Sequence, residues 1–122
     1  MINVKDKVYE ALCNAVENVT DAYPTNWEKF PAVQYMEEDN RVHTWTDDQE
    51  ELSYVRYRVD IWDNVSTSAT ALAVDMQMAS LGLSRIFCQD VDDPSHRKHK
   101  VMRYEAILEQ KSDGEIYVYH EQ

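Results

Sequence analysis

The sequence predicts an α+β protein in which two helices pack on one face of a mostly antiparallel β-sheet, in the order α-β-β-β-α-β-β-β. Apolar residues recur at helical spacing in two segments, and at a period of two in most of the rest. The chain has 122 residues, of which 43% are hydrophobic, enough for one modest core and one domain over residues 1–122. Because each element has one apolar face, stacking both helices on the same side of the sheet buries these faces together.

The first helix is predicted within residues 1–19. Its apolar stripe comprises Val4, Val8, Leu12, Ala15, Val16 and Val19, widened by Tyr9 and Cys13. Asn3 is a suitable N-cap, and Asp6 favours the positive end of the helix dipole. The helix must end before Pro24, and we expect Tyr23, Trp27 and Phe30 to hold the following loop against the core.

Three strands are predicted next. Residues 32–37 and 41–46 are expected to form a hairpin that turns at residues 38–40, and an acidic loop follows at 47–51. The strongest strand covers residues 52–62. Val55, Tyr57, Val59 and Ile61 should point into the core, with Tyr54, Arg56, Arg58 and Asp60 on the other face.

The second helix is predicted over residues 67–81, with Ser66 or Ser68 as its cap. Its main stripe is Ala71, Val74, Met78 and Leu81, and Leu72, Met76 and Ala79 make the stripe broad. Such a broad stripe predicts burial on more than one side of the helix. Gly82 is placed to end the helix in the left-handed conformation, with Leu83 folding back on the last turn.

The last three strands are predicted at residues 85–91, 101–110 and 115–119. A charged loop over 90–100 joins the first two, and Asp113-Gly114 is typical of a tight hairpin turn. The residues expected to be buried are Leu12, Val16, Val59, Ile61, Val74, Met78 and Leu108.

Charge and cysteine content restrict the function classes. With 23 acidic and 12 basic residues, the formal net charge is −11, which disfavours nucleic-acid binding and favours solubility. Cys13 and Cys88 are expected to be buried free thiols of a reducing compartment. The charged, amphipathic start of the chain does not resemble a signal peptide, and no apolar run has membrane-spanning length. We therefore expect a cytoplasmic protein without a membrane partner.

Motifs for catalysis or cofactor binding are absent from the sequence. Gly82 and Gly114 are the only glycines, so neither a phosphate-binding loop nor a serine nucleophile elbow can form. His96 and His99, with Cys88 upstream, are the most metal-like group, but Arg97, Lys98 and Lys100 beside them oppose a bound cation. We expect a solvated basic loop there, no metal or cofactor, and no enzymatic activity.

Two surfaces are candidates for contacts between subunits. The outer face of the strand over 52–62 combines aromatic anchors with charges that could pair. The loop over 90–100 is acidic and then basic, an arrangement that could pair head-to-tail with a copy of itself. The candidate residues are Tyr54, Arg56, Arg58, Asp60, Trp62, Asp92, Asp93, Arg97, Lys98 and Lys100. The alternative is an ordinary surface whose ion pairs contribute little to binding.

Several stretches resemble one protein family. They are FPAVQYMEEDN at 30–40, YRVDIW at 57–62 before a Ser/Thr-rich helix cap, MASLGLSR at 78–85, and MRYE at 102–105. Over roughly residues 3–110, these stretches and the order of the elements resemble the small tail-completion, or tail-terminator, proteins of long-tailed bacteriophages. The resemblance implies an α+β subunit that forms a ring, commonly of six copies, on the head-proximal end of the tail tube. Such a ring contacts the tail-tube protein and the head-connector protein, and the family has no catalytic residues.

The resemblance implies a phage or prophage structural protein, present in the host cytoplasm during assembly and then in the virion tail. Phage head–tail adaptors and minor tail proteins are alternatives of similar size. An acidic inhibitor that mimics DNA would also suit the net charge, although its carboxylates should then form one continuous face.

Overall fold

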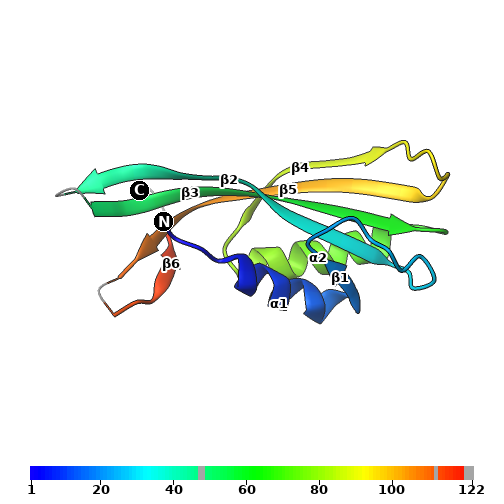
Figure 1. Cartoon of the computed structure of the whole chain (residues 1–122), viewed down its shortest axis with the longest axis horizontal. Coiled ribbons are helices and arrows are strands. Elements are labelled where there is room, and N and C mark those ends of the chain that lie inside the picture. Colours follow the sequence, from blue (N-terminus) through cyan, green and yellow to red (C-terminus); the bar gives the residue numbers. More distant parts are fainter. Residues whose placement is uncertain (47–48, 112, 120–122) are drawn as a thin grey trace.

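The computed structural model describes residues 1–46, 49–111 and 113–119, in which two helices and six strands are present. The elements are α1 (Lys5–Ala15), β1 (Asn18–Thr20), β2 (Ala32–Thr46), β3 (Gln49–Asp63), α2 (Ser68–Ser80), β4 (Ser84–Val91), β5 (Lys98–Gln110) and β6 (Ile116–Val118). Both helices lie side by side on one face of the sheet (Figure 1). The predicted α+β fold is confirmed.

The strands of the sheet lie in the order β1-β2-β3-β5-β4, and β6 pairs with the end of β5. The short β1 runs parallel to β2, and the other pairs are antiparallel. β2 and β3, each 15 residues long, extend well beyond the helices at one end of the molecule (Figure 1).

The predicted hairpin between residues 32 and 46 is wrong, because β2 continues through the expected turn. The pairing of β2 with β3 shifts register between Glu37 and Asp39, which places a β-bulge at Glu38. The acidic run looks like a turn in the sequence, yet Glu38 is paired with Arg56 and Arg103 of neighbouring strands. The predicted order of elements agrees with the structure because β1, which was not predicted, replaces the missing hairpin strand.

The first helix is shorter than predicted. Asn3 Oδ1 accepts a hydrogen bond from Lys5 N (2.9 Å), although Val4 occupies the N-cap position. Val16 already has an extended backbone as the chain turns into β1.

The end of α2 agrees with the prediction. Gly82 has a φ of +85°, and its N–H bonds to Ala79 O (2.9 Å), while Leu83 N–H bonds to Met78 O (3.2 Å). These two bonds form a Schellman motif, which ends the helix at Gly82. At the other end, Thr67 occupies the N-cap position instead of the predicted Ser66 or Ser68, and Ser66 Oγ accepts a hydrogen bond from Ser68 N (3.2 Å). No helix in the described ranges is both long and apolar enough to cross a membrane.

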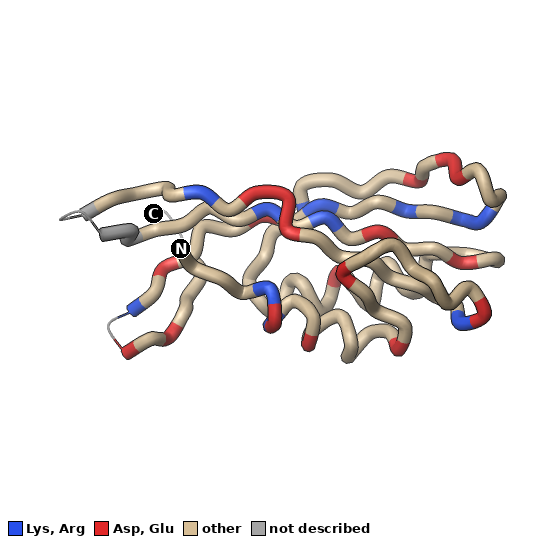
Figure 2. Tube along the Cα trace, in the orientation of Figure 1, with Lys and Arg blue, Asp and Glu red and all other residues tan. Residues whose placement is uncertain are grey.

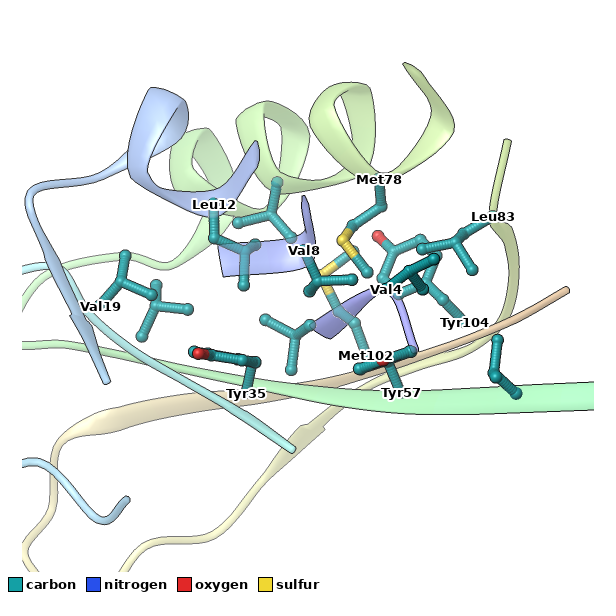
Figure 3. Close-up of a cluster of buried hydrophobic side chains, with 14 of the residues drawn as sticks. Val4, Val8, Leu12, Val19, Tyr35, Tyr57, Met78, Leu83, Met102 and Tyr104 are labelled. Carbon is teal, nitrogen blue, oxygen red and sulfur yellow. The ribbon is translucent and has the colours of Figure 1, made fainter. Parts of the chain in front are cut away.

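The core lies between the two helices and the sheet. Figure 3 shows Val8 and Leu12 of α1 and Met78 of α2 above Tyr57 and Met102 of the strands. The apolar residues predicted for the core are all buried: Leu12, Val16, Val59, Ile61, Val74, Met78 and Leu108. Burial of each large aliphatic side chain contributes about 1.5–3 kcal/mol, so this layer accounts for much of the stability of the fold.

Two burial predictions are wrong. Cys13 and Cys88 are exposed, because Cys13 follows the buried Leu12 on the outer side of α1 and Cys88 lies on the edge strand β4. Helix α2 is buried on one side only, through Ala71, Val74 and Met78.

Candidate functional site

The outer face of the sheet carries a network of charges. Glu38 Oε1 accepts hydrogen bonds from Arg56 Nε (3.4 Å) and Arg103 Nε (3.0 Å), and so joins β2, β3 and β5. The Tyr54 hydroxyl donates to Glu105 Oε2 at 2.7 Å. These side chains are partly exposed, as predicted for Tyr54 and Arg56, and they bond to one another within the chain.

Asp60 is buried, with 4% of its surface exposed, although the sequence predicts that it lies on the charged outer face of the strand. Arg58 donates to it twice, from Nε (2.9 Å) and from the guanidinium Nη2 (3.0 Å). His99 Nε2 lies 2.8 Å from Asp60 Oδ1. The hydrogen bond to Asp60 is the main reason why the pKa of Arg58 is raised. Both Arg58 and Asp60 therefore have their partners within the same chain.

Trp62 is also buried, at 3% exposed, at the centre of an aromatic cluster. It stacks on His99 with ring centroids 4.5 Å apart, and Tyr23 and Trp27 contact it edge-on, each at 5.6 Å. The guanidinium of Arg97 lies 4.3 Å from the centre of the Trp27 ring. The loop between β1 and β2 is thus held by aromatic contacts, as predicted, with Trp62 as its main partner.

The acidic and basic halves of residues 90–100 face each other within the chain, because β4 and β5 pair antiparallel. Lys100 Nζ lies 2.9 Å from Asp90 Oδ1. Asp93 accepts hydrogen bonds from Ser95 and from Trp62 Nε1 (3.3 Å), and those from Ser95 are the main reason why its pKa is lowered. Asp92 and Lys98 are exposed. The sequence predicts a solvated loop here. In the structure, however, His99 and Asp93 of this segment are ordered parts of the fold.

A serine, an aspartate and a histidine meet at this end of the sheet, but their geometry does not form a nucleophile. The Ser95 hydroxyl donates to Asp93 and not to the imidazole of His99. A hydroxyl is activated only when a base accepts its proton, and the base must in turn be oriented by a third group. Among the described residues, no group of three or more His, Cys, Asp or Glu side chains could hold a metal ion.

An open groove of about 480 Å³ lies beside the hairpin formed by β4 and β5. Ser66, Thr67 and Ser68 at the start of α2 form one wall, and the chain from Asp90 to His99 forms the other. The second wall carries both signs of charge, so the groove has no clear preference for an anion or a cation.

The outer side of α2 carries an exposed apolar stripe that is not among the predicted interface residues. Leu72 is 73% exposed and Met76 is 71% exposed, and both point away from the buried side of the helix. Ala69 and Ala79 extend the same apolar stripe. The broad apolar stripe is the signal of this surface in the sequence, although the candidate interface residues predicted from the sequence do not include Leu72 or Met76.

A small apolar groove of about 210 Å³ lies at the C-terminal end of α2, beside β6. The residues that line it are Val4, Lys7, Ser80, Leu81, Leu83, Leu108, Ile116, Tyr117 and Val118. Its floor is continuous with the core through Val4, Leu83 and Leu108.

The sequence matches no protein-family model, and no curated protein matches it.

Proposed function

We propose that this protein is a structural subunit of a bacteriophage tail. Copies form a ring, of six subunits as the resemblance implies, that caps the head-proximal end of the tail tube and joins it to the head connector. The support is the resemblance over residues 3–110 together with an α+β architecture of the kind that the resemblance implies.

The observation that carries the proposal is the exposed apolar side of α2. Leu72 and Met76 are large side chains on a regular helix, and each leaves about seven-tenths of its surface in water. Large apolar side chains exposed next to one another favour contact with another protein. A subunit that works by assembly needs such a surface, and an isolated acidic domain does not.

The shape of the subunit also supports a role between partners. β2 and β3 extend past the helices at one end of the molecule, and the β4–β5 hairpin extends past them at the other (Figure 1). A ring subunit must contact its neighbours at its sides and other virion proteins at its two ends. The helices and the two extended strand pairs provide surfaces in these different directions.

The arrangement of charges argues against a DNA mimic. Figure 2 shows acidic and basic residues interleaved along the strands. On the outer face of the sheet, Glu38 lies between Arg56 and Arg103, and Asp60 is held by Arg58. The carboxylates therefore do not form one continuous negative face.

Deletion of the gene from the phage or prophage that carries it tests the proposal. Heads and tails should accumulate unjoined, with overgrown tails, when particles are inspected by electron microscopy. Joined virions in normal yield from the deletion would refute the proposal.

A milder test reverses the charge of Arg56, which is partly exposed, to glutamate. The subunit should stay folded, and joining should be reduced. Arg58 is unsuitable for this test, because its loss would leave the buried Asp60 without its main partner. Lys29→Glu, the same change of charge at an exposed loop position, is the control and should join normally.

A further inference from the structure

We infer that the outer side of α2 of one subunit packs into the β6 groove of the next copy of the chain. The contact between subunits is then head-to-tail. This inference deepens the proposed function. The ring in the tail rests on that proposed function, whereas the contact itself involves only two copies of this chain.

The projecting half of the contact is the stripe of Leu72 and Met76, one helical turn apart and flanked by Ala69 and Ala79. Because alanine side chains are small, the backbone of a partner can approach the helix closely at Ala69 and at Ala79. The stripe faces away from Ala71, Val74 and Met78, which hold the helix on the core. A partner can therefore bind the stripe without any change in the fold.

The receiving half is the groove beside β6. Its volume of about 210 Å³ is below the ~300–1,000 Å³ of most small-molecule sites. A cavity of about 150 Å³ already holds a benzene-sized group, so the groove can accept the end of a leucine or methionine side chain. Leu81, Ile116 and Val118 at its walls are only partly buried in the subunit, and burial by a partner would complete their packing.

Charge favours these two surfaces for contact between identical chains. Two copies that each carry a net charge of −11 repel one another, so contact is least costly where charge is low. α2 has a single charged residue, Asp75, which is held by Arg85 Nη1 (3.3 Å) and by the Tyr104 hydroxyl (2.8 Å). Of the described residues that line the groove, Lys7 alone is charged, and its charge is positive.

The two surfaces are different: the stripe lies along the outer side of α2, and the groove lies at the C-terminal end of α2, where Ser80 and Leu81 line it. A contact between unlike surfaces repeats from copy to copy and closes into a ring if the rotation is suitable, whereas α2 packed on α2 would end at a dimer. The contact is small, so a single one is weak, and several that close together in a ring become strong.

Crosslinking tests which surfaces meet. In a chain with Cys13→Ser and Cys88→Ser, one variant carries Met76→Cys and a second, size-tagged variant carries Tyr117→Cys. The two variants mixed at high concentration should form a mixed disulfide dimer under mild oxidation, and neither should crosslink to itself. Glu28→Cys, at an exposed loop position, replaces Tyr117→Cys as the control for random collision. Crosslinking of Met76→Cys to itself alone, or no crosslink above the control, would overturn the inference.

Sedimentation velocity of the full chain gives an independent test. The wild type should self-associate as concentration rises, and Leu72→Glu with Met76→Glu should weaken association about tenfold or more, as loss of interface anchors does. Thr25→Glu with Gln89→Glu, which adds two negative charges at exposed positions elsewhere, is the matched control. A wild type that stays monomeric at its highest soluble concentration would refute the contact.

These outcomes can be separated from those of the deletion experiment. If the mixed crosslink forms but the deletion leaves head–tail joining intact, the contact stands and the proposed function fails. If joining requires the gene but the double α2 variant joins normally, the proposed function stands and this contact fails.

Discussion

Tyr57 and Tyr104 are paired directly across β3 and β5, and both are fully buried, but only Tyr104 has a hydrogen-bond partner for its hydroxyl in the described part of the chain. The Tyr104 hydroxyl donates to Asp75 Oδ1 at 2.8 Å. Burial, and next the charge of Glu37, raises the pKa of Tyr57, although its hydroxyl makes no hydrogen bond with good geometry. The two tyrosines therefore differ in one polar contact in almost the same surroundings.

Substitution of each tyrosine by phenylalanine should separate these contributions. Tyr104→Phe should lower the free energy of unfolding by about 1.5–3 kcal/mol, because a hydrogen bond to a carboxylate is lost. Tyr57→Phe should be neutral or slightly stabilising, because a buried hydroxyl without a partner is removed. Urea unfolding of the three proteins measures the difference. Equal losses for both variants would show that the Tyr57 hydroxyl has a partner after all.

Ile61→Asp should prevent folding. Ile61 is fully buried in the core on the inner face of β3, and an unpaired carboxylate there costs several kcal/mol, out of a total stability of ~5–15 kcal/mol. The variant should be insoluble or lack a cooperative melting transition. Met36→Asp is the control, because Met36 is 41% exposed and lies opposite Arg58. A soluble, cooperatively melting Ile61→Asp protein would mean that the two faces of β3 are reversed.

Gly82→Ala should destabilise the protein more than Gly114→Ala. Both glycines have positive φ, +85° and +87°, so each substitution costs on the order of 1 kcal/mol in backbone strain. A Cβ at Gly82 would also lie 2.6 Å from Val118 Cγ2, whereas a Cβ at Gly114 would contact nothing within 4 Å. Thermal unfolding of both variants measures the excess. Gly82→Ala should cost less stability in a Val118→Ala background than in the wild type, and an equal cost in both backgrounds would exclude this contact as its cause.

Ser95→Ala should raise the pKa of Asp93 towards its ordinary value. In the folded protein, hydrogen bonds from Ser95 are the first cause of the lowered pKa. When folding lowers the pKa of a carboxyl group, the group stabilises the folded protein at any pH above its pKa in the unfolded chain, which is about 4. This stability is lost as the pH falls through the pKa of the group in the folded protein. Stability should therefore fall less steeply with acidification in the variant. NMR titration of the Asp93 carboxyl is the direct measurement, and Ser84→Ala, at an exposed strand position, should leave the titration unchanged.

Sequence periodicity was sufficient wherever one face of an element meets the core. The inner face of β3, the buried side of α2 and the αL end of α2 at Gly82 were all predicted, because side-chain alternation and glycine conformation are local properties. The predicted core residues followed from the same patterns.

Only the tertiary structure decided what depends on partners distant in sequence. Glu38 lies in a strand and not in a turn because Arg56 and Arg103 neutralise it from β3 and β5. Asp60 is buried because Arg58 and His99 satisfy its carboxylate. No pattern along the chain shows that His99, on the neighbouring strand β5, lies beside Asp60. Leu72 and Met76 remain in water because neither the sheet nor α1 reaches that side of α2. Local sequence sets which face of an element is apolar, but contacts distant in sequence decide which charges are paired and which apolar surface stays exposed.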